Sequence, residues 1–207
     1  MMVKDPSSIT TLYAGCHDPD GPMCLLEAVA YVAGEPWSDH PVCVCPVLAA
    51  FGRNWNDGMR TNEERGSLLQ YIPLLIGTRS TPAVELRRSY MALDWLVRRA
   101  MPAWLRLAEA DLDSHAQALE NLAVIDSPTT ANAAGPLITA ARVASGAALW
   151  VGTGVAARAT GGQDTSRNAD LHAVWDAARA SLEPSGVILQ PQAHELFRAM
   201  IAVKDGQ

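Results

Sequence analysis

Signals that start helices recur along this chain and constrain the fold more than any other feature of the sequence. Pro46 and Pro82 stand at expected first helical positions, the second directly after Thr81. Proline is favoured there because the N–H that it lacks would have no partner within the helix. Thr61 is followed three residues later by Glu64, which is the spacing of a capping box. Between such signals apolar residues recur at the spacing of one helix face. The sequence therefore predicts an all-α fold.

About eight helices are expected, packed as a multi-helix bundle in a single globular domain. They are expected over residues 22–33, 46–56, 62–77 with a break at Pro73, 82–100, 103–110, 114–122, 137–159, 169–182 and 191–203. The first of them is expected to begin at Pro22, with Asp20 or Gly21 as its cap. Strand-like alternation is confined to residues 42–44 and 187–189, and such short runs do not argue for a sheet.

The helix expected at residues 82–100 is amphipathic. Its inner face is expected to carry Leu86, Tyr90, Leu93, Leu96 and Val97, and its outer face Arg87, Arg88, Arg98 and Arg99. A turn-rich stretch at residues 127–136 is the best candidate for a subdomain boundary. It would separate a core rich in cysteine, histidine and aspartate (residues 1–126) from alanine-rich helices (residues 127–207) that pack on that core within one domain.

Charge and hydropathy argue against two classes of partner. The chain has 207 residues and a formal net charge of -6, so no nucleic-acid partner is expected, because phosphate binding needs clustered Lys and Arg. The longest apolar run, residues 143–157, is too short to span a bilayer, so no membrane partner is expected. The N-terminal sequence MMVKDPSSIT has no apolar segment of the kind found in secretory signals, which predicts a cytoplasmic location.

Residues 15–58 contain all four cysteines and two of the five histidines. Thiolate and imidazole groups are the ligands that zinc prefers, so one hypothesis is a zinc site at Cys16, His40 and Cys43. No Cys-x2-Cys pair is present, and spacing more than ligand count makes such motifs specific. The alternative is that the cysteines are free thiols that pack as small apolar residues.

A second hypothesis is a thiol site. Cys24 is expected in the first turn of its helix, where unpaired N–H groups and the helix dipole favour a thiolate. His40 would be its base, and Asp39 or Asp57 would orient that imidazole. Glu27 opposes this hypothesis because a nearby carboxylate raises the pKa of a thiol. Antiparallel packing of the first two helices would also carry Asp39 and His40 away from Cys24. The alternative is a buried, inert Cys24.

Caps and turns offer structural roles for most of the other polar residues. Asp39 suits a helix N-cap, and Asn56 with Asp57 suits a turn. Glu27 lies among apolar residues of its helix and, together with Cys24, is left unexplained by caps and turns. The structural roles and the ligand hypothesis are both kept as alternatives. The candidate ligand or thiol site comprises Cys24, Glu27, Asp39, His40, Asn56 and Asp57.

Four runs carry a resemblance to other proteins. They are MCLLEAVAYVAGEPWSDHPVCVCPVLAAFGRNWND (residues 23–57), YIPLLIGT (71–78), RSYMALDWLVR (88–98) and PAWLRLA (102–108). In these runs, which lie within roughly the first 125 residues, the chain resembles a set of uncharacterised helical proteins from GC-rich bacteria and their phages. The resemblance implies a cytoplasmic all-helical domain, and it implies no activity, cofactor or functional residue.

Two classes of function follow from the sequence. The first is a helical interaction or regulatory protein without identifiable catalysis, which binds a protein partner or self-associates through the small-residue faces of residues 137–159. The second is a ligand-binding or metal-binding site in residues 15–58, with a thiol-dependent reaction as one form of it. Whether the protein is an enzyme is left open by the sequence.

Overall fold

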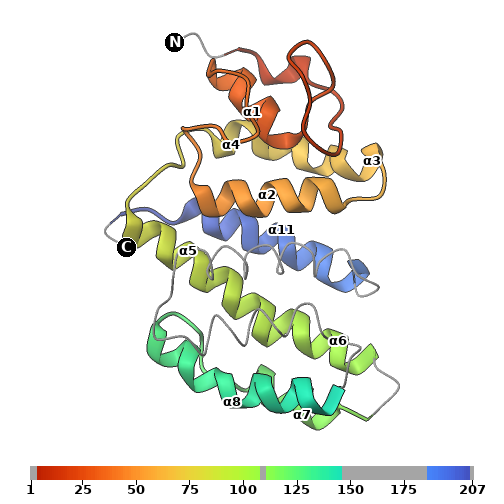
Figure 1. Ribbon diagram of the computed structural model, residues 1–207, viewed down its shortest axis with the longest axis vertical. Coiled ribbons are helices and arrows are strands. Elements are labelled where there is room, and N and C mark those ends of the chain that lie inside the picture. Colours follow the sequence, from red (N-terminus) through yellow and green to blue (C-terminus); the bar gives the residue numbers. More distant parts are fainter. Residues whose placement is uncertain (1–3, 108–110, 146–185, 206–207) are drawn as a thin grey trace. The chain divides into compact units, whose positions relative to one another are not determined.

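The computed structural model describes residues 4–107, 111–145 and 186–205, and these residues form helices joined by loops (Figure 1). No strand occurs within these three ranges. The predicted all-α class is therefore confirmed for the described part of the chain. The total of about eight helices and the single globular domain stay predictions. By their internal contacts the residues fall into two units, one of residues 1–85 and 199–207 and the other of residues 86–198.

The first unit is built from short helices of its first 75 residues. Its helices are η1 (Pro6–Ser8), α1 (Leu25–Ala33), α2 (Pro46–Gly58), α3 (Asn62–Arg65), η2 (Gly66–Tyr71) and α4 (Ile72–Leu75). Helix α1 contacts both α2 and α4. Phe51 and Trp55 of α2 meet edge to face with ring centroids 5.5 Å apart, and Trp55 lies 6.2 Å from the ring of Tyr71. These three buried rings form the aromatic centre of the unit.

Two of the predicted helix starts in this unit are confirmed. Helix α2 begins at Pro46, and α3 begins at Asn62 after Thr61, whose side chain accepts a hydrogen bond from the Glu64 N–H. The start predicted at Pro22 is wrong, because Cys24 is the N-cap and α1 begins at Leu25. The helix predicted at residues 62–77 is divided into α3, η2 and α4, and Gly77 with φ +76 ends the series.

The helix that begins at Pro82 continues past the position where a break was predicted. Helix α5 (Pro82–Trp95) runs into a π-helical turn, η3 (Leu96–Ala100), and then into α6 (Met101–Leu107). The Met101 N–H donates to the carbonyl of Leu96, five residues back. Pro102, which has no N–H, follows within the same helical path, so the separation predicted at Pro102 is wrong. The wider π-helical turn changes which carbonyls pair with which N–H groups just before Pro102, and the helix continues through a proline that would otherwise interrupt it.

The faces predicted for residues 82–100 are confirmed in part. Tyr90, Leu93, Leu96 and Val97 are buried as expected, and Arg87 and Arg99 are exposed. Leu86 and Arg88 are the reverse of the prediction, because Leu86 is 40% exposed and Arg88 is 2% exposed.

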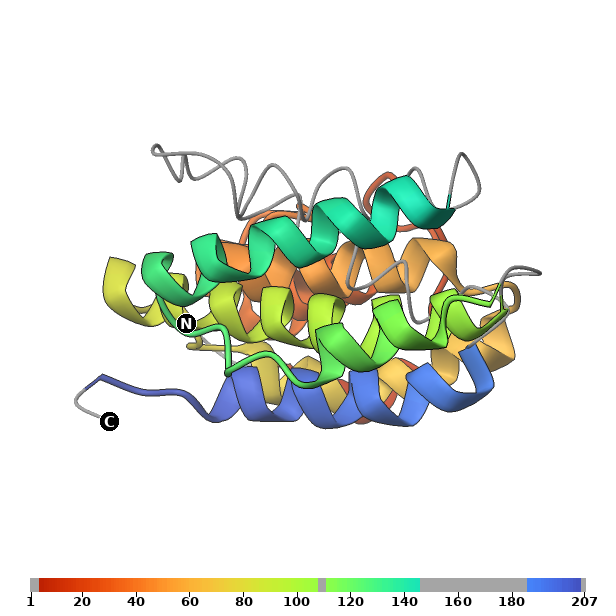
Figure 2. The ribbon, with the colours of Figure 1, turned by 90° about the horizontal axis from the view of Figure 1, so that it is seen from below.

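The second unit also holds α7 (Asp113–Glu120), α8 (Pro128–Ser145) and most of α11 (Gly186–Ala202). Helix α6 contacts α7, and α7 contacts α8; Figure 2 shows α8 along its length. Residues 128–136, predicted as part of a turn-rich stretch and subdomain boundary, form the first half of α8. The helix predicted at residues 169–182 and the part of residues 137–159 after 145 lie outside the described residues.

None of the helices within the described residues is both long enough and apolar enough to cross a membrane.

The end of α1 gives the first testable prediction. Gly34 has φ +70 at the C-cap, and the following Glu35 N–H donates to the Ala30 carbonyl. Gly34→Ala should lower the free energy of unfolding by about 1 kcal/mol, because a side chain disfavours the left-handed conformation. Gly66→Ala is the matched control, since Gly66 has φ -53 and an added Cβ would meet no atom within 4 Å. Urea unfolding of both variants checks the difference, and equal losses would contradict it.

Candidate functional site

The pair that the sequence left unexplained, Cys24 and Glu27, forms a capping box at the start of α1. The Cys24 N–H donates to Glu27 Oε2 at 2.8 Å, and the Glu27 N–H lies 3.5 Å from Cys24 Sγ, which accepts from it. Cysteine here takes the position that serine or threonine usually has in this motif. Both residues are 1% exposed. Glu27 is therefore a buried carboxylate with a structural partner in its own first turn.

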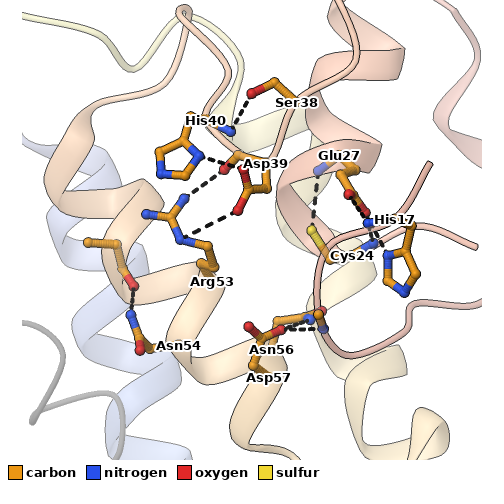
Figure 3. A network of polar contacts seen from close by, with 12 residues as sticks. His17, Cys24, Glu27, Ser38, Asp39, His40, Arg53, Asn54, Asn56 and Asp57 are labelled. Carbon is orange, nitrogen blue, oxygen red and sulfur yellow. Dashed lines mark hydrogen bonds and ion pairs between the residues drawn. The ribbon is translucent and has the colours of Figure 1, made fainter. Parts of the chain in front are cut away.

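His17 supplies the other partners of Glu27 (Figure 3). The His17 N–H donates to Glu27 Oε1 at 2.7 Å, and the imidazole Nδ1 lies 2.9 Å from Oε2. We assign the proton to Nδ1, because an ionised carboxylate only accepts hydrogen bonds. The His17 carbonyl in turn accepts from Trp37 Nε1 at 2.7 Å. Both carboxylate oxygens of Glu27 are thus occupied by donors from the loop before α1 and from the helix start.

Asn56 and Asp57 hold the same loop from the side of α2. Asn56 Nδ2 donates to the Tyr13 carbonyl at 2.8 Å, and Asn56 Oδ1 accepts from the Leu25 N–H at 3.2 Å. The Asp57 carboxylate accepts from the Gly15 N–H at 2.9 Å. Asn56 is fully buried and lies within α2, so the turn proposed for Asn56 and Asp57 is not their role. They join the loop before α1 to the end of α2.

Arg65 binds the backbone at the end of α2, next to Asn56 and Asp57. Its Nε donates to the Asn56 carbonyl at 2.8 Å, and its guanidinium also donates to the Met59 carbonyl and to Asn62 Oδ1. Arg65 is 5% exposed. A buried guanidinium with three acceptors is satisfied, and it fixes the backbone from which Asn56 and Asp57 extend.

Asp39 and His40 lie in the loop between α1 and α2, and they form a separate group with Arg53. His40 Nδ1 is 2.5 Å from Asp39 Oδ1, while Arg53 donates to the Asp39 carbonyl at 2.7 Å and reaches its Oδ2 at 3.9 Å. Asp39 does not cap α2, whose N-cap is Cys45. The His40 side chain is 68% exposed. The imidazole of this group is therefore open to solvent, whereas the Asp39 and Arg53 side chains are mostly covered.

The four cysteines are all free thiols in different surroundings. Burial raises the pKa of Cys24 to about 12. Burial also raises the pKa of Cys43, whose N–H donates to the Glu35 carboxylate at 2.8 Å. The negative charge of Asp39 raises the pKa of the exposed Cys16. Cys45 is fully buried. A raised pKa means less thiolate, which is the reactive form.

The candidate residues therefore divide into two groups by their hydrogen bonds. Cys24, Glu27, Asn56 and Asp57 hold the start of α1, the end of α2 and the loop between Tyr13 and Met23 in place. Asp39 and His40 pair with Arg53 instead, with Cys16 beside Asp39. Cys43 is held by Glu35. Within residues 4–107, 111–145 and 186–205 no group of three or more His, Cys, Asp or Glu side chains is arranged to hold a metal ion.

His17 is the residue of this region whose role sequence reasoning missed. It lies ten residues before Glu27 in a loop, and no helical spacing links the two. The hydrogen bond between Cys24 and Glu27 could have been predicted from the sequence, because the two residues have the spacing of a capping box.

Comparison of the chain with protein-family models, with curated proteins and with solved structures finds no match. The resemblance to helical proteins of GC-rich bacteria and their phages thus stays a prediction, and the functional argument rests on the residues themselves.

Asn56 and Asn54 offer a matched test of the Asn56 bridge. Asn56→Ala should cost about 2 kcal/mol of unfolding free energy, because it leaves the buried Leu25 N–H and Tyr13 carbonyl without their partner. Asn54→Ala removes a single bond to the Ala50 carbonyl in the preceding turn and should cost under about 1 kcal/mol. Chemical unfolding of both variants checks this order, and a larger loss for Asn54→Ala would refute the role given to Asn56.

Proposed function

We propose that the protein is a helical interaction or regulatory protein that acts by self-association and has no catalysis of its own. The groups that a reaction in residues 15–58 would need are largely used to hold local structure. Glu27 accepts from His17 and from Cys24, and the Cys24 thiol has its pKa raised to about 12 by burial.

The observation that carries the proposal is the outer face of α8. The inner face of this helix buries Ala131, Ala134, Ile138 and Ala141. The exposed positions are also largely apolar, and they include Ala133, Pro136, Leu137, Ala140, Val143 and Ala144. Arg142 is the one charged residue in the sequence of α8. A helix that is apolar on both faces usually has both faces covered, so the outer face of α8 has the composition of an interface.

The outer face of α8 suits a second copy of the chain as its binding partner. Small side chains let two helices approach closely, and an uncharged face does not repel its own copy. A two-fold pairing would bring the same residues of both molecules together, as in most homodimers. A partner that relied on charge would find little to recognise, because exposed acidic or basic side chains lie outside this face.

Leu137→Glu tests the proposal. A carboxylate at this 36% exposed position would be buried between two copies, so self-association should weaken at least tenfold, about 1.4 kcal/mol. Leu107→Glu on α6 is the control, because Leu107 is 60% exposed and lies outside α8. Sedimentation equilibrium measures the association, and thermal unfolding confirms that each variant folds. A wild-type protein that stays monomeric at all concentrations, or a control that dissociates equally, would reject the proposal.

A ligand or metal site is the second candidate function, and one observation favours it. The Asp39 carboxylate lies beside the Cys16 thiol and on the Nδ1 side of His40, so the exposed imidazole is oriented with its Nε2 away from Asp39. A carboxylate on one ring nitrogen is the usual partner of a histidine that binds a metal through the other. Zinc is the cofactor that a thiol and an imidazole would take together, and binding one ion would require the Cys16 thiol to move to the Nε2 side of the His40 ring.

Three single variants test this second candidate. If Cys16 and His40 bind zinc, Cys16→Ser and His40→Gln should each lower zinc affinity at least tenfold. Cys43→Ser should leave it unchanged, because the Cys43 thiol is paired with Glu35 and not with Asp39 or His40. Zinc titration by calorimetry measures all four proteins. The absence of zinc binding by the wild type, or an equal effect of Cys43→Ser, would remove this candidate.

A further inference from the structure

The loop from Tyr13 to Met23, called the strap below, is attached to the first unit by hydrogen bonds alone among its described contacts. None of its residues is buried, whereas Leu12 just before it and Cys24 just after it are almost fully buried. The strap closes on itself through the Tyr13 N–H and the Met23 carbonyl, 2.9 Å apart. A segment without a buried apolar side chain gains little from the hydrophobic effect, so its closure depends on its polar contacts.

The strap's hydrogen bonds to Asn56, Asp57, Glu27 and Trp37 lie at three points, and the Cys16 thiol lies beside the Asp39 carboxylate at a fourth. The Tyr13 carbonyl accepts from Asn56, and the Gly15 N–H donates to Asp57. His17 makes the third and densest contact, with two hydrogen bonds to Glu27 and one from Trp37 to its carbonyl. Each hydrogen bond contributes modestly to stability, and more where one partner is charged. The total is small compared with the stability of a whole domain, which permits the strap to open while the helices stay folded.

The third contact links the strap to the Cys24 thiol. Glu27 Oε2 accepts from both the His17 imidazole and the Cys24 N–H, and Cys24 Sγ accepts from the Glu27 N–H. Figure 3 shows the three side chains gathered where the strap meets α1. We propose that the strap is a conformational gate on Cys24, held closed by the His17–Glu27 contact, which withholds this thiol from reagents in solution until the strap opens.

The chemistry of the closed state supports this gate. With a pKa of about 12, roughly one Cys24 thiol in 10,000 would be ionised at pH 8. Opening the strap admits water to the start of α1 and removes the burial that raises this pKa. Access and ionisation therefore change together, and both favour reaction in the open state. This inference concerns a conformational device and is independent of the self-association proposed above.

Alkylation of the four cysteines by iodoacetamide, followed residue by residue by mass spectrometry, tests the gate. In the wild type, Cys16 should react fastest because it is exposed, and Cys24 slowly. His17→Ala removes the imidazole contact and leaves the capping box of Cys24 and Glu27 intact. The Cys24 rate should then rise about tenfold to a hundredfold, which corresponds to a loss of about 1.5–3 kcal/mol from the closed state. The rate for Cys45, buried at the start of α2, should not change.

A second variant and a control sharpen the result. Glu27→Gln leaves one acceptor oxygen for three donors, so it should raise the Cys24 rate at least as much as His17→Ala. His40→Ala is the control histidine, because its partner is Asp39, and it should leave Cys24 unchanged. The gate is overturned if Cys24 of the wild type reacts as fast as Cys16, or if His17→Ala leaves its rate unchanged. An equal rise at Cys24 and Cys45 would also overturn it, because that pattern reports global unfolding.

Discussion

The arrangement of the first unit depends on one buried carboxylate. An ionised Glu27 at 1% exposure would cost several kcal/mol without partners, and its two oxygens are matched by donors from His17 and Cys24. Two of these donors come from a loop that has no buried side chain. The start of α1 and the path of that loop are therefore set together, because the same carboxylate accepts hydrogen bonds from both.

The same constraint explains why a segment rich in chemical groups need not be a reaction site. Catalysis requires groups whose lone pairs or protons are available to a substrate. In the contacts around Glu27 these are used by backbone N–H groups and by an imidazole. Asn56 and Arg65 repeat this pattern, since each connects backbone groups of separate segments. Asp39 and His40 differ because the imidazole is exposed, and that difference is why they alone support a ligand hypothesis.

What the sequence predicted well was local, and what it missed depended on contacts between distant residues. Pro46 and Thr61 start helices through their own geometry and neighbours, so their positions were predictable. The start at Leu25 was missed because a cysteine N-cap is uncommon, and its cap is strengthened by His17 from a loop. The exchange of Leu86 and Arg88 between faces has no explanation in helical spacing, because Tyr90 and Leu93 of the same helix are buried as predicted.

Helix α8 shows that a sequence pattern can predict a helix without telling which of its faces the chain covers. Small-residue helix faces were predicted only from residue 137 onward, and the inner face of the whole helix buries Ala131, Ala134, Ile138 and Ala141. Its outer face has nearly the same composition, yet Leu137 is 36% exposed and Val143 72% exposed. Local propensity does not distinguish a face that the chain covers from one that another molecule covers. An apolar outer face costs solubility unless it is used, so the exposed Leu137 and Val143 make α8 one of the described elements with apolar surface left to bury.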